Sequence, residues 1–200
     1  MKYKNIVFDV GDVLISYRWQ EMLMDYGLSQ DEATRVGTML FEDKDLLWSR
    51  FDKGEFTEEQ LIEQYCEKYP KDKDAIRFFI HHGEYMHVPR PKVWEQVHRL
   101  KEKGYGIYIL SNYSEVLFKK HTRYADFLDD VDGMLVSYMV KLAKPDVKIY
   151  EELFERFHIK PEECLFFDDR KENVEAAKKL RMDSIQVLSK EQLIEELKRL

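Results

Sequence analysis

The sequence predicts an α/β protein in which helices cover both faces of a parallel sheet, and a small all-helical insert leaves the core after the first strand. An apolar run at residues 4–8 ends at Asp9 and Gly11, which predicts a buried strand followed by a loop. Residues 19–84 instead show helical periodicity with few β-branched runs. From residue 92 onwards helical and strand patterns alternate, as they do in parallel sheets with helical crossovers.

The helical insert is expected to contain four helices, and two of them carry a start signal. Ser29 is followed three residues later by Glu32, and Thr57 by Gln60. Each pair fits the capping box that begins a helix. The expected helices cover residues 19–26, 30–40, 57–69 and 72–80.

The segment Val88-Pro89-Arg90-Pro91 interrupts the helical pattern and predicts a domain junction. We therefore expect an α/β core made of residues 1–15 and 88–200, and a helical cap made of residues 16–87. In the second part of the core, helices are expected at residues 92–103, 115–123, 147–157, 172–180 and 191–200, and strands at residues 106–110, 134–136, 164–167 and 184–187.

Composition and charge narrow the range of partners. Apolar residues make up 44% of the chain, enough for a packed core, and the 36% of charged residues indicate a solvated surface. The net charge of −7 argues against nucleic acid or an anionic membrane as the main partner. Cys66 and Cys164 show no metal-ligand spacing, and no run approaches the ~18 apolar residues of a membrane span. Without a signal-peptide pattern, we expect a cytoplasmic protein, either a monomer or a homodimer.

The residues able to carry chemistry gather where the expected strands end. Ligands of open α/β sheets bind at the carboxyl ends of the strands, so these side chains should meet there. One lysine cannot neutralise three carboxylates in a partly desolvated cleft, whereas a hard divalent cation with oxygen ligands, such as Mg²⁺, can. A cation with free hydrogen-bond donors suits a phosphoryl group. The residues concerned are Asp9, Ser111, Asn112, Lys144, Asp168 and Asp169.

These residues carry a family resemblance. In order and spacing, four motifs resemble those of the haloacid dehalogenase superfamily: FDVGDVL, LSN, AKPD, and FFDD followed by Asn173. The resemblance covers nearly the whole chain, and the helical insert lies where that family places its first-position (C1) cap. It implies a Rossmann-like core, a Mg²⁺-dependent phosphoric monoester hydrolase, and a small phosphorylated metabolite as substrate. Gly11 and the small cap most resemble the sugar-phosphate phosphatases that act on glucose 1-phosphate.

The resemblance implies a role for each matching residue at the metal end of the site. Asp9 would be the nucleophile and, through its other oxygen, a magnesium ligand, so that an aspartyl-phosphate forms on it. The backbone carbonyl of Gly11 and the side chain of Asp169 would be the other protein ligands. Asp168 would orient a metal-bound water, and Asn173 would support the ligands from behind.

Other residues would act on the substrate. Ser111 and the backbone at Asn112 would bind the phosphoryl oxygens, and Lys144 would neutralise charge on the nucleophile and the transferring group. Arg18 and Trp19 follow the first motif at the entrance to the helical insert. We expect one of these two side chains to contact the substrate.

The first motif departs from the family pattern at Gly11. The family usually has a second Asp at this position, which protonates the leaving group and then activates water. Such general acid–base help is worth about 10²–10⁴-fold in rate. The enzyme could therefore be slow, could use substrates with a good leaving group such as anomeric sugar phosphates, or could use another group. Asp12 is adjacent but out of phase, so we expect its side chain to point elsewhere.

Other functions also fit part of the pattern. A protein that binds a phosphorylated ligand without hydrolysing it, for regulation, would not need the missing acid. A haloacid dehalogenase would use the first Asp without a metal, but Asp168 and Asp169 would then have no role. A phosphomutase would depend on the acid that is missing. The leading interpretation is a phosphatase for a sugar phosphate or a similar metabolite.

Overall fold

A parallel sheet of five strands forms the centre of the protein in the computed structural model, which describes residues 2–200. The strand order is β5-β4-β1-β6-β7, so the N-terminal strand lies in the middle. Every pairing in this sheet is parallel, and Ile6 of β1 lies opposite Ile107 on one side and Leu165 on the other. The strands are β1 (Asn5–Phe8), β4 (Gly106–Ser111), β5 (Gly133–Val136), β6 (Cys164–Asp168) and β7 (Asp183–Gln186).

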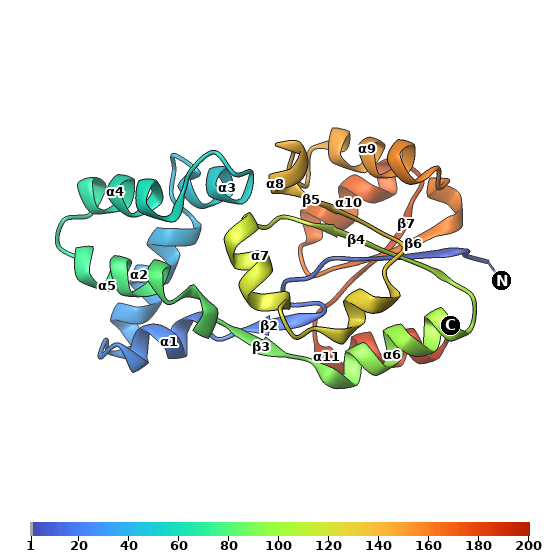
Figure 1. Ribbon diagram of the computed structural model, residues 1–200, viewed down its shortest axis with the longest axis horizontal. Helices are drawn as coiled ribbons and strands as arrows, with labels where there is room; N and C mark the ends of the chain where they lie inside the picture. Colours follow the sequence, from blue (N-terminus) through green and yellow to red (C-terminus); the bar gives the residue numbers. More distant parts are fainter. Residues whose placement is uncertain (1) are drawn as a thin grey trace.

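Helices cover both faces of the sheet (Figure 1). Because successive strand residues point to opposite faces, Ile6 and Phe8 pack in one apolar cluster and Val7 in another. The first cluster includes residues of α6 (Pro91–Glu102) and α11 (Lys190–Lys198). The second includes residues of α9 (Val147–Phe157) and α10 (Lys171–Lys179). The expected three-layer α/β architecture is therefore confirmed.

Five helices form the helical insert beside the carboxyl edge of the sheet (Figure 1). Both expected capping boxes are present: the Ser29 hydroxyl accepts from the Glu32 amide, and the Thr57 hydroxyl accepts from the Gln60 amide. In each box the N3 side chain reaches back to the N-cap amide, which satisfies a second free donor. The helices are α1 (Trp19–Asp25), α2 (Gln30–Phe41), α3 (Leu47–Asp52), α4 (Glu58–Lys68) and α5 (Lys73–His81).

Helix α3 is an element that the sequence did not predict. It is one of the shorter helices of the insert, it begins after Leu46 in a left-handed conformation, and it has no side-chain cap. The insert packs around an aromatic cluster in which the Phe41 and Trp48 rings lie 4.8 Å apart and the Phe41 and Phe79 rings 5.9 Å apart. Edge-on contacts of this kind place Trp48, on α3, against α2 and α5.

The helical insert joins the sheet through two short strands that lie side by side. Strand β2 (Ile15–Tyr17) pairs antiparallel with β3 (His87–Pro89), so the chain leaves and returns along one ribbon (Figure 1). Arg90 follows this ribbon, and its guanidinium donates to the Asp12 carbonyl at 2.6 Å and to the Ser16 hydroxyl at 2.6 Å. The division into a core and a cap at residues 15/16 and 87/88 stays a prediction, since the ribbon spans both positions.

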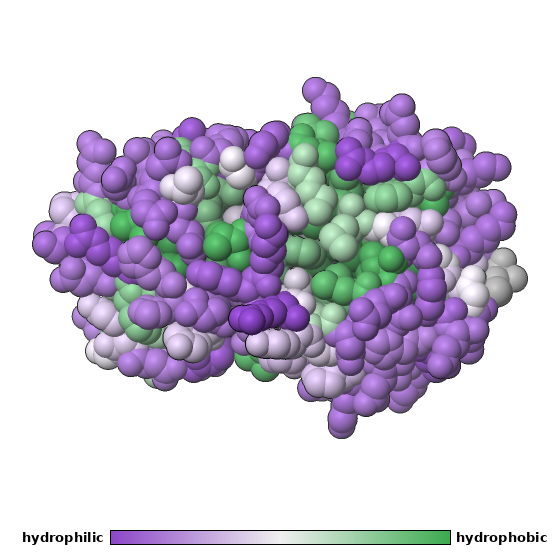
Figure 2. All heavy atoms as spheres, in the orientation of Figure 1, coloured by the Kyte–Doolittle hydropathy of each residue, from purple (hydrophilic) through white to green (hydrophobic). Residues whose placement is uncertain are grey.

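The remaining short elements connect these layers. They are α7 (Glu115–Thr122), α8 (Ser137–Val140) and the 3₁₀ turns at Gly83–Tyr85, Asp126–Asp130 and Pro161–Glu163. Figure 2 shows hydrophilic residues over most of the outer helix surfaces on the face drawn, with hydrophobic residues gathered toward its middle. Among residues 2–200, no helix combines the length and apolar character that a membrane crossing requires.

Candidate active site

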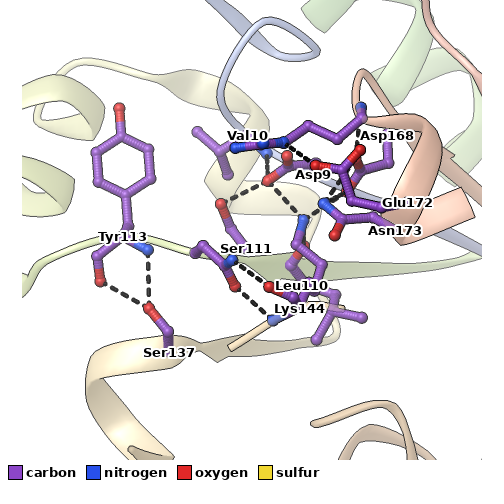
Figure 3. Close-up of polar contacts among 12 residues, drawn as sticks. Asp9, Val10, Leu110, Ser111, Tyr113, Ser137, Lys144, Asp168, Glu172 and Asn173 are labelled. Carbon is purple, nitrogen blue, oxygen red and sulfur yellow. Dashed lines mark hydrogen bonds and ion pairs between the residues drawn. The ribbon is translucent and has the colours of Figure 1, made fainter. Parts of the chain in front are cut away.

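Asp9 directly follows the central strand and is almost fully buried. Its Oδ1 accepts a hydrogen bond from the Ser111 hydroxyl at 2.6 Å and from the Val10 amide at 2.7 Å (Figure 3). The Lys144 ammonium lies 3.0 Å from the same oxygen. Three donors therefore hold one oxygen and orient the carboxylate. Among residues 2–200, no donor is hydrogen-bonded to Oδ2.

Lys144 lies at the centre of the polar cluster. Its Nζ is 2.6 Å from Asp168 Oδ2 and donates to the Leu110 carbonyl at 2.8 Å (Figure 3). Burial favours the neutral amine, but the carboxylates of Asp168 and Asp9 outweigh it and raise the pKa of Lys144. The side chain is thus a fixed positive charge between two strand ends.

Asn112 and Asn173 act as supports around this lysine. The Asn112 side chain donates to the Lys144 carbonyl at 2.9 Å and accepts from the Lys144 amide at 2.8 Å, so it holds the lysine backbone by both groups. The Asn173 amide donates to both oxygens of Asp168, at 2.9 and 3.1 Å. Asp168 Oδ1 also accepts from the Arg170 amide. Both oxygens of Asp168 are therefore already engaged.

Three carboxylates form a group that could hold a cation. Asp9, Asp168 and Asp169 each offer an oxygen within 4.8 Å of the others. Burial raises the pKa of Asp9 to about 6, with Lys144 opposing this rise and Asp168 adding to it. Burial, and then the charge of Asp9, raise the pKa of Asp169 to about 7. Excess negative charge of this kind, presented by hard oxygen donors, suits Mg²⁺.

The position of Gly11 is closed by Tyr17. A Cβ atom placed on Gly11 would lie 2.6 Å from the Tyr17 hydroxyl oxygen and 2.8 Å from Cε2 of its ring. The side chain of a second Asp has no room there unless Tyr17 moves. Asp12 also lines the cavity, but its Oδ1 accepts from the Tyr17 amide and lies 3.8 Å from the guanidinium of Arg90.

A cavity of about 560 Å³ lies between the sheet edge and the helical insert. This volume is in the range of sites for small organic molecules. Ser111 and Asp168, which were also predicted from the sequence, do not line the cavity. At the sheet end the wall contains six of the predicted residues: Asp9, Gly11, Asn112, Lys144, Asp169 and Asn173. At the insert end the wall is mostly apolar and aromatic: Trp19, Phe41, Leu46, Trp48, Met86 and Leu117.

Arg18 and Trp19, the two candidates at the entrance to the insert, lie in different surroundings. Trp19 stands in the cavity wall and packs edge-on against Phe41, with 5.6 Å between ring centroids. The guanidinium of Arg18 instead forms an ion pair with Asp25 at 2.6 Å, and Arg18 does not line the cavity. The structure thus places Trp19, but not Arg18, in the wall of the cavity.

Tyr17 and Asp52 also line the cavity, but neither lies in a motif that predicts a role in the site. Burial raises the pKa of Asp52 to about 8, with the Ser114 amide opposing and the charge of Asp9 adding to the rise. Both residues come from the ribbon or the insert, so their place in the cavity depends on how the insert packs against the sheet.

Comparisons with known proteins agree with this geometry. The profile of haloacid dehalogenase-like hydrolases matches residues 3–181. The chain is similar to the sesquiterpene phosphatase astK of Aspergillus oryzae, with 23% identity over 180 residues, 90% of this chain and 87% of the relative. It is 24% identical over 189 residues to the phosphatase MT3486 of Mycobacterium tuberculosis, 89% of this chain and 84% of the relative.

A solved structure shares the fold. The HAD family enzyme bt-2542 of Bacteroides thetaiotaomicron, in complex with magnesium and inorganic phosphate, superposes with a TM-score of 0.71 and 24% identity. The alignment covers 94% of this chain and 96% of that one. Since the family profile spans almost the entire chain, the protein belongs to the haloacid dehalogenase-like hydrolases.

Proposed function

We propose that the protein is a Mg²⁺-dependent phosphatase that hydrolyses the phosphate monoester of a small organic molecule through an aspartyl-phosphate on Asp9. The observation that carries this proposal is the oriented carboxylate of Asp9 beside the buried Lys144 ammonium, at the sheet end of an open cavity. Two relatives are named phosphatases, and a similar structure holds magnesium with phosphate.

The metal would be held by Asp9, the Gly11 carbonyl and Asp169. Asp168 is the third carboxylate of the group, but Lys144 and Asn173 already occupy its oxygens, which favours Asp169 as the ligand. When bound, the cation would neutralise the phosphoryl oxygens and the cluster of carboxylates around them. The burial that raises the pKa of Asp9 and Asp169 supports this assignment, because uncompensated charge there is unfavourable.

The nucleophilic step uses the free side of Asp9. One oxygen is held by Ser111, Val10 and Lys144, so the carboxylate cannot rotate freely. An oxygen of Asp9 attacks phosphorus, the bond to the ester oxygen breaks, and a carboxylate–phosphate anhydride forms. Water then attacks the same phosphorus, which releases inorganic phosphate and restores Asp9.

Lys144 and Ser111 would stabilise charge on the phosphoryl group as it transfers. Lys144 is a permanent cation because two carboxylates hold its proton, and it needs little movement to reach a phosphoryl oxygen beside Asp9. The Ser111 hydroxyl donates a hydrogen bond to Asp9, and it can turn to donate to a phosphoryl oxygen instead. Asn112 contributes by fixing the backbone of Lys144 through two hydrogen bonds.

The substrate beyond the phosphate would rest against the insert. The resemblance suggests a sugar phosphate, and aromatic walls such as Trp19 and Trp48 can stack on the apolar face of a sugar ring. The same walls also accept a wholly apolar group. A screen of hexose phosphates, nucleotides, phosphorylated acids and prenyl or aryl phosphates distinguishes these classes.

Phosphate release from p-nitrophenyl phosphate tests the proposal directly. We expect turnover with excess Mg²⁺, loss of turnover with EDTA, and loss of turnover in Asp9→Asn with the melting temperature retained. Glu151→Gln, at an exposed carboxylate of α9 outside the cavity, is the matched control and should keep its activity. Release no faster than in buffer, or an Asp9→Asn variant that keeps full activity, would overturn the proposal. Binding of beryllofluoride and Mg²⁺ without any turnover would instead indicate a regulatory binding protein.

A further inference from the structure

The proposed reaction requires a proton for the leaving group, and this inference rests on that proposed function. In the family, a second Asp in the first motif usually provides the proton, and Gly11 takes its place here. The Tyr17 hydroxyl fills the space where that side chain would start. A water molecule therefore cannot take the place of the missing acid at that point. A different group in the cavity has to reach the ester oxygen.

Five carboxylates line the cavity: Asp9, Asp12, Asp52, Asp169 and Glu172. Four of them have other partners or roles. Asp9 is the proposed nucleophile and Asp169 the proposed metal ligand. Asp12 accepts from the Tyr17 amide and faces Arg90, and Glu172 is paired with Arg170 at 2.6 Å. Asp52 is the carboxylate that remains.

Hydrogen bonds hold Asp52 where helix α3 of the insert contacts the loop and helix that follow strands β4 and β5. It is the last residue of α3, and its Oδ1 accepts from the Ser114 amide at 3.1 Å. Its backbone carbonyl accepts from the Ser137 hydroxyl at 2.5 Å. Ser114 lies in the loop after β4, and Ser137 is the first residue of α8, directly after β5, so the end of α3 is docked on the sheet side. Among residues 2–200, no donor is hydrogen-bonded to Oδ2 of Asp52.

In-line displacement decides on which side the proton is needed. The attacking and leaving oxygens lie on opposite sides of phosphorus. Asp9 attacks from the sheet edge, so the ester oxygen points toward the helical insert. From this placement we propose that Asp52 is the catalytic acid and base of the reaction: it protonates the leaving oxygen as the P–O bond breaks and later takes a proton from the water that attacks the aspartyl-phosphate. The two transfers cancel, and the net reaction is hydrolysis.

The electrostatic setting of Asp52 agrees with this role. Burial, with a smaller contribution from Asp9, raises its pKa to about 8, so the carboxyl holds its proton at neutral pH. The other titratable groups that interact with it are the phenols of Tyr17, Tyr65 and Tyr113, whose own pKa values are raised and which stay neutral. Within residues 2–200, no cation is paired with Asp52.

The dependence of rate on the leaving group tests the inference. The leaving alcohol of an alkyl phosphate needs a proton, whereas p-nitrophenolate departs without one. We expect Asp52→Asn to lower kcat by about 10²-fold or more on an alkyl phosphate and by less than about tenfold on p-nitrophenyl phosphate. The asparagine oxygen can still accept from Ser114, so docking of α3 is kept, and an unchanged melting temperature verifies this.

Two further variants make the result decisive. Glu172→Gln changes another cavity carboxylate and should show no dependence on the leaving group. Tyr17→Phe removes the hydroxyl nearest Gly11 and should likewise reduce both substrates equally, if at all. An equal loss on both substrates for Asp52→Asn, no loss on either, or a selective loss in Tyr17→Phe would overturn the inference. Because wild-type turnover of p-nitrophenyl phosphate is measured in the same assay, failure of the inference is distinguished from failure of the proposed function.

Discussion

Lys144 and Asp168 form an ion pair of 2.6 Å in which both side chains are almost completely buried. Such a pair is held in place less by its own attraction than by the cost of leaving either partner alone in a medium of low polarity. Here the lysine faces two carboxylates, Asp168 and Asp9, so its removal would leave two buried negative charges without a neighbouring cation. The chemistry and the stability of the sheet edge therefore depend on the same ammonium group.

Replacing Lys144 by Met should destabilise the protein by about 3–5 kcal/mol at neutral pH, because buried charges lose their partner. The loss should shrink as the pH falls toward about 6. Lys144 lowers the pKa of Asp9, so without the lysine Asp9 takes up a proton at a higher pH than in the wild type, where its pKa is about 6. Urea unfolding at several pH values measures both effects. Lys148→Met, at an exposed lysine, is the control and should change little. A loss for Lys144→Met that did not vary with pH would contradict this account.

Gly11→Ala should destabilise the protein by about 1–3 kcal/mol, since the added methyl group overlaps the Tyr17 hydroxyl. In a Tyr17→Ala background the same change should cost almost nothing. The comparison is a double-mutant cycle on the free energy of unfolding, and a coupling of about 1 kcal/mol or more is expected for two groups in direct contact. Additive effects would show that the two residues do not compete for the same space.

Asp52 should make the protein less stable as the pH rises. Its pKa is about 8 in the folded protein and has the ordinary low value in the unfolded chain, so the folded state binds the extra proton between these values. The stabilisation is present at acid pH and is lost as the pH rises through about 8. The stability of Asp52→Asn should therefore fall less steeply than that of the wild type between about pH 4 and 8, and in parallel with it at higher pH. Urea midpoints without metal, compared with Asp183→Asn at the opposite sheet edge, measure the difference.

Magnesium should raise the melting temperature of the wild-type protein, because a ligand that binds only the folded state stabilises it. Asp169→Asn should abolish most of this rise. Without the metal the same variant should melt higher than wild type, since it removes a carboxylate whose pKa burial and Asp9 raise to about 7. Differential scanning fluorimetry with and without Mg²⁺ measures both shifts. A full magnesium response in Asp169→Asn would remove that residue from the ligand set.

Much of the fold could be predicted because its signals are local. Hydrophobic runs located the five strands of the sheet, and the boxes at Ser29 and Thr57 located the starts of α2 and α4. Helix α3 carries no such signal, since Leu46 precedes it in a left-handed conformation without a capping side chain. The strands of the ribbon are three residues long, which is too short for an alternation of apolar and polar residues to be recognised. Strand β3 also contains Pro89, a residue that argues against a strand in the sequence.

The two ends of the cavity also differ in how far the sequence predicts them. Asp9, Ser111, Lys144 and Asp168 meet because parallel strands bring their carboxyl ends to one edge, which topology alone dictates. Asp52 lines the same cavity as Asp9 and Lys144 only because α3 docks on Ser114 and Ser137, and sequence periodicity does not predict this packing.

The paired strands β2 and β3 carry a mechanical consequence. Both chain connections between the sheet and the insert run along this one ribbon, so a bend in the ribbon would move the five helices together. Asp52 would move with them while Asp9 stays on the sheet. If Asp52 acts as proposed, an open position of the insert would admit the substrate but separate the two carboxyl groups, and catalysis would require the insert to close.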